Sequence, residues 1–202
     1  MVNYSSAYRR YGRRVTPWER YAQVSGTAVA EVFQQELEGR AEPPGRALDL
    51  GCGRGTYTPE LARLGWDAVG VDAAPEAIAG AQRRGDAGIR YVIGDVTELE
   101  EAGLGRFDLF VDIGCFQGLG AEQREAMGCS VTALANPGAT LLMFAFGWTR
   151  FRSMIEGVSR DEIEDALPGW EMLAAWPAPT AGLGWPMDRT SPQWYRLGLR
   201  AS

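Results

Sequence analysis

The 202-residue sequence contains no histidine and no lysine, so all 20 of its basic residues are arginines. Without histidine, Ser-His-Asp triads and histidine-ligated metal sites are excluded, and without lysine, Schiff-base chemistry is excluded. Acidic residues outnumber basic ones by six. A protein that binds nucleic-acid phosphates over a broad surface normally carries the opposite charge, so we expect no nucleic-acid partner.

Cysteines and long apolar runs are also scarce. The three cysteines, Cys52, Cys115 and Cys129, form no Cys-x-x-Cys pair, which is typical of reduced thiols in a cytoplasm. The first residues lack the apolar segment of a secretory signal. The longest apolar stretch, 139–146, is too short to span a bilayer. We therefore expect a cytoplasmic protein without a membrane partner.

From residue 46 onward, short apolar strands alternate with helical patterns. Five strands are predicted in this part of the chain, at 47–50, 67–71, 90–93, 106–112 and 139–146. This alternation is typical of a parallel, doubly wound sheet. Two later strands, near 170–176 and 193–199, lack a helix between them, which predicts an antiparallel hairpin at one edge. The predicted fold class is α/β, with a Rossmann-like, doubly wound, seven-stranded sheet and an antiparallel C-terminal hairpin.

The N-terminal region differs in pattern from the rest of the chain. Arginines alternate with three tyrosines, ending at Tyr11, whose spacing would place the three rings on one face of a helix. Pro17 suits the first position of a further helix. We predict an N-terminal helical cap over 1–42 and a Rossmann-like domain over 43–202. Two interpretations stay open, a cap docked on the main domain and a lid that closes over a ligand.

The strongest motif is a glycine-rich turn after the first strand, in which Asp49 is followed by Gly51, Gly53 and Gly55. Glycines at such a turn let a ligand approach the backbone, and the N-terminus of the next helix offers N–H donors. The nicotinamide-binding fingerprint requires its third glycine at position 56, which is Thr56 here, so a nicotinamide dehydrogenase is disfavoured. A carboxylate beside the turn favours a cationic ligand instead.

Carboxylates also follow the next three strands. Asp72 ends the second strand and could accept both hydroxyls of a ribose, Asp95 and Val96 follow the third strand, and Asp112 ends the fourth. Doubly wound sheets bind their ligands in the crevice outside the carboxyl ends of the strands. Four carboxylates at four successive strand ends therefore predict a binding site, although each one alone would be typical of a helix cap or a solvated turn.

Residues 46–146 resemble the core of the class I S-adenosylmethionine (SAM)-dependent methyltransferases. The resemblance is carried by the order of four segments, ALDLGCGRGTYTPELARLGWDAVGVD, VIGDV, FDLFVDIGCFQGL and ALANPGATLLMFAF. Within this family, the segment Thr16-Pro17-Trp18-Glu19 is similar to the small-molecule branch of thiopurine, tellurite-resistance and halide/thiol methyltransferases.

The resemblance implies that SAM is the cofactor and that S-adenosylhomocysteine is its product. It implies that the glycine turn lies against the methionine part of SAM, with Asp49 near its ammonium group and Asp72 on its ribose. The full set of implied cofactor contacts is Trp18, Asp49, Gly51, Cys52, Gly53, Gly55, Asp72, Ala73, Asp95, Val96, Asp112 and Ile113.

One departure from the family pattern affects the catalytic prediction. Related sequences carry Cys-Phe-His-Gly-Leu after the fourth strand, whereas this sequence has Gln117 in place of the histidine. Histidine can remove a proton near pH 7 and glutamine cannot. The candidate catalytic residues are Asp112 and Gln117, and a general base is either absent or supplied by a carboxylate or a tyrosine. Gln117 either contacts the acceptor or only hydrogen-bonds the backbone.

The predicted function is in-line methyl transfer from SAM to a small molecule. Without a histidine base, readily ionised acceptors are favoured, namely a thiol, a phenol or acid, or an unprotonated nitrogen. The predicted acceptor contacts are Tyr11, Cys115, Phe116, Gln117, Trp148 and Trp185. Two alternatives stay open: a non-methylating cyclisation or decarboxylation on the same fold, and a SAM-binding partner subunit without activity. We expect a monomer or a homodimer that binds no metal.

Overall fold

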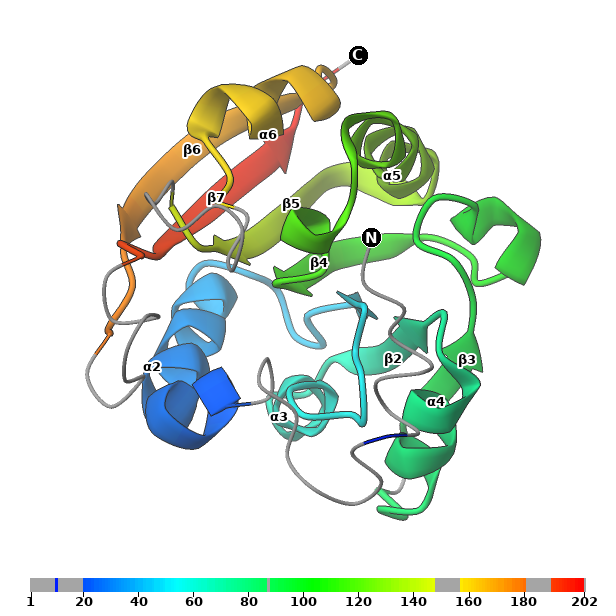
Figure 1. Ribbon diagram of the computed structural model, residues 1–202. Coiled ribbons are helices and arrows are strands. Elements are labelled where there is room, and N and C mark those ends of the chain that lie inside the picture. The colour runs from blue at the N-terminus through cyan, green and yellow to red at the C-terminus, as the bar shows by residue number, and fades with distance from the viewer. Residues whose placement is uncertain (1–9, 11–19, 87, 148–156, 181–189, 202) are drawn as a thin grey trace.

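The computed structural model describes residues 10, 20–86, 88–147, 157–180 and 190–201. Its seven strands are β1 (Arg46–Leu50), β2 (Asp67–Asp72), β3 (Arg90–Ile93), β4 (Phe107–Ile113), β5 (Ala135–Ala145), β6 (Trp170–Pro177) and β7 (Gln193–Leu199). They form one sheet in the order β3-β2-β1-β4-β5-β7-β6 (Figure 1). Strands β1 to β5 pair in parallel, whereas β7 is antiparallel to both β5 and β6. The predicted fold class, including the hairpin at one edge, is confirmed.

Helices cover both faces of this sheet (Figure 1). The described helices are α2 (Arg20–Leu37), α3 (Thr58–Arg63), α4 (Pro75–Gln82), α5 (Ala121–Ala133) and α6 (Arg160–Ala166), with short 3-10 turns η1 (Leu99–Ala102) and η2 (Phe116–Gly118). The first three lie on one face, and α5 and α6 lie on the other. None of the helices that the structure describes is long and apolar enough to cross a bilayer.

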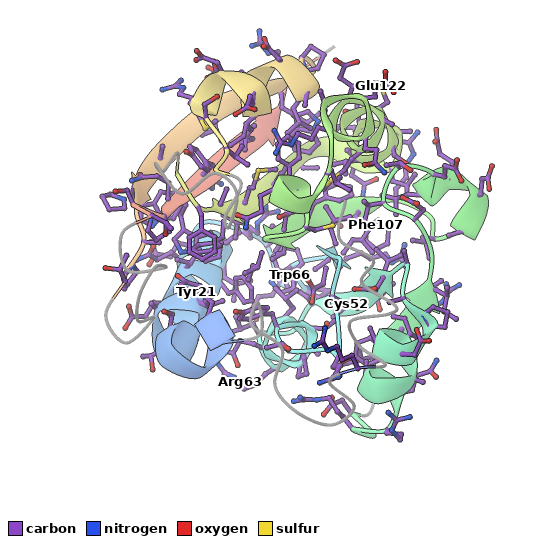
Figure 2. The ribbon with its side chains drawn as sticks, in the orientation of Figure 1. Tyr21, Cys52, Arg63, Trp66, Phe107 and Glu122 are labelled. Atoms are coloured by element: carbon purple, nitrogen blue, oxygen red, sulfur yellow. The ribbon has the colours of Figure 1, made fainter. Side chains whose placement is uncertain are left out.

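The pleat of the strands divides the core between the two faces, because successive side chains of a strand point to opposite sides. In β1, Leu48 belongs to the core cluster beneath α5 and α6, and Ala47 belongs to the cluster beneath α2 and α3. Tyr21 and Trp66 lie in the second cluster and Phe107 in the first (Figure 2). Both faces of the sheet are therefore covered by apolar packing.

Helix α6 begins where a sequence motif predicts it. The Ser159 hydroxyl accepts a hydrogen bond from the backbone N–H of Glu162 at 3.2 Å, and the Glu162 carboxylate accepts one from the Ser159 N–H at 2.8 Å. This reciprocal pair is a capping box, a Ser-x-x-Glu pattern that is typical of a helix start, and it satisfies two backbone N–H donors.

Strand β5 differs from its prediction because it begins at Ala135, four residues earlier than expected. The segment that follows, Asn136-Pro137-Gly138, has the composition of a turn, which hides the strand start from pattern analysis. In the structure Ala135 pairs with Phe107, and the register then shifts before Leu109 pairs with Thr140. This irregularity absorbs the turn-like residues within one strand.

Helix α2 is the described part of the predicted N-terminal cap. Its inner face is buried on the sheet through Val29 and Phe33, and Tyr21 stacks on Phe144 with ring centroids 4.1 Å apart. These contacts join α2 to the same apolar cluster as β4 and β5. The division of the chain at residue 42 stays a prediction.

Candidate cofactor and acceptor site

The sheet order creates a switch point between β1 and β4. The chain moves outward from β1 to β3 and then returns to place β4 on the other side of β1. In register, Leu50 at the end of β1 pairs with Val71 of β2 and with Asp112 of β4. The carboxyl ends of β1, β2, β3 and β4 therefore meet at one edge, where open α/β sheets bind ligands.

The glycine turn that leaves β1 depends on glycine for its conformation. Gly51, Gly53 and Gly55 have φ values of 66°, 57° and 68°, in the left-handed region that side chains disfavour. A Cβ on Gly51 would also lie 2.7 Å from the Cβ of Cys115, and a Cβ on Gly55 would collide with the Tyr91 hydroxyl. The turn therefore keeps bare backbone at the edge of the sheet.

Asp72 holds the glycine turn against the end of β2. Its Oδ2 accepts a hydrogen bond from the Gly53 N–H at 2.9 Å, and its Oδ1 accepts one from the Ala74 N–H at 2.8 Å. Burial raises the pKa of this carboxyl although both hydrogen bonds lower it. Because each carboxylate oxygen has a second lone pair and the side chain is only half-buried, Asp72 can accept two further hydrogen bonds from a ligand.

Asp49 lies beneath the turn with only 2% of its surface exposed. Its Oδ2 accepts a hydrogen bond from the Thr58 hydroxyl at 2.6 Å. Burial, with a smaller contribution from the neighbouring carboxylate of Asp72, raises the pKa of Asp49 to about 7, although the Thr58 hydrogen bond lowers it. A buried carboxylate whose charged neighbour is another carboxylate favours a cation, which would stabilise its ionised form.

The end of β3 carries a second carboxylate turn. Asp95 Oδ1 accepts hydrogen bonds from the N–H of Thr97 at 2.9 Å and from its hydroxyl at 2.7 Å. Val96, between Asp95 and Thr97 in the sequence, is buried in the core. Oδ2 of the exposed Asp95 could therefore accept a donor such as an adenine amino group.

Asp112 holds the loop that follows β4. It is fully buried, its Oδ1 accepts from the N–H groups of Gly114 and Cys115, and its Oδ2 accepts from the N–H of Phe116, at distances of 2.9–3.1 Å. Burial raises its pKa to about 7. These three hydrogen bonds direct the Asp112 carboxylate to the backbone of the loop. Among the described residues, Asp112 therefore positions the loop and makes no contact expected of a general base.

The loop after β4 brings Gln117 to the end of β5. The Gln117 Oε1 accepts a hydrogen bond from the backbone N–H of Phe146 at 3.0 Å, and Cys115 lies half-buried beside Gly51. Phe116 is only 1% exposed and packs in the core, with the Arg124 guanidinium 5.1 Å from its ring centroid. Its ring packs beneath α5, and its predicted contact with the acceptor stays a prediction.

Comparison with known proteins points to methyltransferases. A family model described as a methyltransferase domain matches residues 47–138. The chain is also 33% identical over 147 residues to a 2-heptyl-1-hydroxyquinolin-4(1H)-one methyltransferase of Mycobacteroides abscessus, across 69% of this chain and 63% of that protein. Residues 47–138 therefore match a methyltransferase domain, and the chain is similar to a methyltransferase over 147 residues.

Solved structures of methyltransferases share the fold of this protein. A protein studied for the conversion of a disulfide bond into a thioacetal group in echinomycin biosynthesis matches with a TM-score of 0.75 and 22% identity, over 97% of this chain and 91% of its own. Magnesium protoporphyrin IX methyltransferase from Synechocystis PCC 6803, solved with SAH, matches with a TM-score of 0.72 and 16% identity, over 98% of this chain and 94% of its own. These likenesses show the fold.

Four predicted site residues, Tyr11, Trp18, Trp148 and Trp185, lie outside the described residues. Asp49, Asp72, Asp95 and the glycine turn come together at the carboxyl edge, with Ala73 exposed and Ile113 partly exposed beside them. The side chain of Cys52 is buried against Gly70, and its N–H donates to Val71 O, so its contribution to the site is through its backbone.

Sequence reasoning missed three residues that shape this site. Thr58 bonds Asp49, Tyr91 approaches Gly55, and Arg124 contacts the loop after β4. Thr58 follows the glycine turn by only three positions, and a hydroxyl there was an available signal. Tyr91 and Arg124 gave none, because their contacts are made across the fold.

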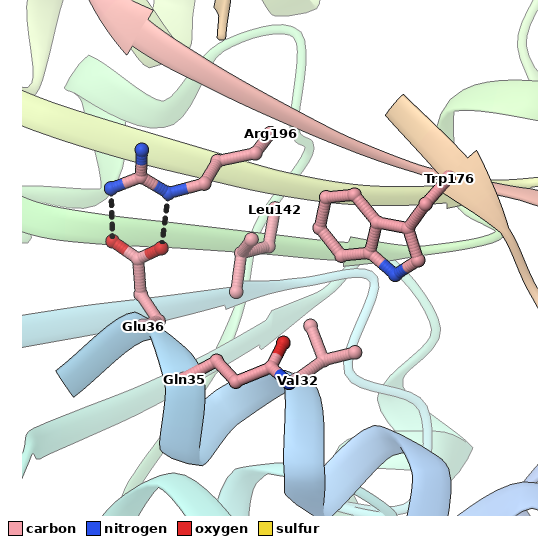
Figure 3. A pocket seen from close by; sticks show the side chains of 6 residues that line it. All are labelled: Val32, Gln35, Glu36, Leu142, Trp176 and Arg196. Carbon is pink, nitrogen blue, oxygen red and sulfur yellow. Dashed lines mark hydrogen bonds and ion pairs between the residues drawn. The ribbon is translucent and has the colours of Figure 1, made fainter. Parts of the chain in front are cut away.

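An open pocket of about 320 Å³ lies elsewhere, between α2 and the strands β5, β7 and β6 (Figure 3). Leu142 and Trp176 supply its apolar surface, and Arg196 pairs with Glu36 at one end. Because this guanidinium is already bound by a buried carboxylate, the pocket offers less charge to a ligand than the carboxyl edge does. The carboxyl edge is the better candidate site.

Proposed function

We propose that this protein transfers a methyl group from SAM to a small-molecule acceptor. The observation that carries the proposal is the convergence of the glycine turn, Asp49 and Asp72 at the switch point between β1 and β4. A second support is the similarity to methyltransferases, including one whose name gives a hydroxyquinolone as its substrate. The chain spans only 63% of that relative's length, so its acceptor need not be the same.

The residues of the site fit SAM by their chemistry. Bare glycine backbone would take the methionine part, the two oxygens of Asp72 would accept the ribose hydroxyls, and buried Asp49 would be neutralised by a cationic group. Asp95 and Val96 would hold the adenine. When bound, SAM supplies a methyl group already activated by its attachment to a positively charged sulfur.

The described residues of the site contribute alignment and not proton removal. Asp112 is occupied by three backbone N–H groups, Gln117 has no basic group, and the sequence has no histidine. Holding two reactants in line can contribute roughly 7–11 kcal/mol, whereas a general base adds about 10²–10⁴-fold in rate. We therefore propose acceptors that ionise by themselves, such as a thiol with a pKa near ~8.5, an acidic phenol or an unprotonated nitrogen.

The net charge of −6 favours a small molecule over a nucleic acid as the acceptor. The chain's dominant charge would repel a phosphate backbone at long range. A cytoplasmic location and a monomeric or homodimeric state stay predictions.

The test is mass spectrometry of the purified protein with SAM and a panel of small thiols, phenols, carboxylates and amines. We expect S-adenosylhomocysteine and a product heavier by one methylene to appear together. A product formed without consumption of SAM would favour a cyclisation or decarboxylation. SAM binding without any product would favour a non-catalytic partner subunit.

A further inference from the structure

We infer that Gln117 is a fixed hydrogen-bond donor that selects acceptor molecules carrying a carbonyl or oxyanion oxygen beside the methylated atom. The inference rests on the proposed function for the location of the acceptor. It narrows the proposed small-molecule acceptor to molecules that carry such an oxygen.

The orientation of the Gln117 amide follows from its partner. Phe146 presents a backbone N–H, which can only donate, so the atom 3.0 Å away must be the amide oxygen of Gln117. The amide nitrogen with its two N–H groups then points away from Phe146. Among the described residues this nitrogen donates no hydrogen bond, and the side chain is partly exposed. Gln117 can therefore offer donors to a ligand.

The place of Gln117 in the fold puts those donors on the acceptor side of the site. The residue lies in η2, which begins three residues after the end of β4, and Phe146 directly follows β5. Their hydrogen bond thus bridges the carboxyl ends of β4 and β5. The glycine turn and Asp72, which would hold the cofactor, lie at the ends of β1 and β2 on the other side of β4. A molecule approaching the cofactor over β4 and β5 meets Gln117.

A buried arginine fixes the backbone of the same turn. Arg124 is 6% exposed; its Nε donates to Phe116 O at 3.2 Å, and its Nη2 donates to Gln117 O at 3.4 Å. Its Nη1 pairs with Glu162 of α6 at 3.0 Å. Asp112 binds the N–H groups of the same loop from the other side. The side-chain amide of Gln117 therefore extends from a backbone that is fixed by hydrogen bonds, and a selective contact requires such a fixed position.

Such a donor recognises lone pairs and cannot remove a proton. The Gln117 amide would bind a neutral carbonyl and an oxyanion alike. When the acceptor molecule lacks such an oxygen, the amide N–H donors would be left without a hydrogen-bond partner in the complex. A hydrogen bond to the attacking atom itself would weaken that atom as a nucleophile. We therefore expect the recognised oxygen to be a neighbour of the methylated atom.

The test compares wild type with Gln117→Glu. The carboxylate of this variant can still accept from the Phe146 N–H, but it has no donor at pH 8. Gln117→Met removes the donor without adding charge. Gln34→Glu, on the exposed side of α2, is the matched control for the change in charge. Far-UV circular dichroism and S-adenosylhomocysteine affinity check that each variant is folded.

The probes are benzenethiol, which lacks the recognised oxygen, and its relatives 2-mercaptobenzamide and 2-mercaptobenzoate, which carry it. Their binding to protein saturated with S-adenosylhomocysteine is measured by calorimetry, and kcat/KM for methylation is measured with SAM. For wild type and Gln34→Glu we expect the two oxygen-bearing probes to bind roughly tenfold more tightly than benzenethiol. Both Gln117 variants should lose this preference, with benzenethiol affinity changed by less than about threefold.

Three results would overturn the inference. The Gln117 variants could lose affinity equally for all three probes, the wild type could bind the oxygen-bearing probes no more tightly than benzenethiol, or no oxygen-bearing probe could bind. The binding arm separates this inference from the proposed function. Oxygen-dependent binding without methyl transfer would refute the proposed function alone. Methyl transfer without oxygen dependence would refute the role of Gln117 alone.

Discussion

Buried carboxylates occur in two regions of this protein, and their surroundings differ. In the region of α2, β5 and β7, the Glu36 side chain is 1% exposed and is bound by Arg196 at 2.7 Å, Arg40 at 2.6 Å and the Thr140 hydroxyl at 2.7 Å. Burial raises the pKa of Glu36, but these hydrogen bonds outweigh burial and hold the pKa below its ordinary value.

At the carboxyl edge, Asp49 and Asp112 are buried as deeply, but their partners are hydroxyl and backbone N–H groups. Their pKa values are both raised to about 7, chiefly by burial. Among the described residues, arginines neutralise the buried charge of the first region, whereas the hydrogen-bond partners of Asp49 and Asp112 are uncharged. A buried carboxylate without a cationic partner costs stability unless a ligand supplies the cation, so this comparison supports the proposal that the carboxyl edge binds a ligand.

The largest effect is expected from Glu36→Ala. Removing this carboxylate leaves Arg40 and Arg196 without their shared partner, and we expect a loss of about 3 kcal/mol in the free energy of unfolding. Urea denaturation at pH 7 measures the loss. Glu31→Ala, exposed on the same helix, is the control and should change stability by less than about 0.5 kcal/mol.

The contribution of Glu36 also has a defined pH dependence. Because its folded-state pKa is lowered, its stabilisation is present above the ordinary value of 4.5 and is lost as the pH falls through the folded-state pKa. The difference between wild type and Glu36→Ala should therefore shrink in acid. A difference that is small at pH 7, or constant down to pH 3, would contradict the assignment of this region as a neutralised structural site.

For Asp72→Ala we expect SAM to bind at least roughly tenfold more weakly, because two charge-assisted hydrogen bonds to the ribose would be lost. Titration calorimetry measures the affinity. Asp67→Ala, at the other end of β2 where the side chain is 62% exposed, is the matched control and should bind SAM like wild type. Unchanged affinity in folded Asp72→Ala would refute the mapping of the cofactor onto the carboxyl edge.

Asp49→Asn should have effects of opposite sign on binding and on stability. The amide oxygen can still accept from Thr58, but the charge that a cationic ligand would neutralise is gone, so SAM affinity should fall roughly tenfold. At pH 8 the ligand-free variant should be at least as stable as wild type in urea, since a buried ionised carboxylate has been removed. Loss of stability on the scale of Glu36→Ala would erase the contrast between the two regions.

The smallest effect is the pH dependence of SAM binding. Asp49 is protonated and neutral well below its folded-state pKa of about 7, so the affinity for a cation should rise several-fold between pH 5.5 and pH 7.5. The stability of the ligand-free protein should fall over the same range, because the folded state binds more protons than the unfolded chain. Calorimetry across this range measures the slope, and an equally steep slope in Asp49→Asn would assign it to another group.

Prediction from the sequence succeeded where a signal lies within a few residues. The strand and helix alternation, the glycine turn and the capping box of Ser159 and Glu162 are all local patterns, and each appears in the structure. The sequence did not indicate how deeply each residue of a loop is buried. Phe116 lies in the same loop as Gln117, but its ring packs in the core beneath α5, whereas Gln117 is partly exposed.

The sequence by itself determined which strand ends carry carboxylates and which turn exposes its backbone, because those properties follow from two-residue strand alternation and from glycine. Only the tertiary structure decided which carboxylate is neutralised. Glu36 meets Thr140 and Arg196, which lie 104 and 160 positions further along the chain. Asp49 meets a hydroxyl nine positions away. Charge compensation depends on what the fold brings within hydrogen-bond distance, and no local pattern encodes contacts over such separations.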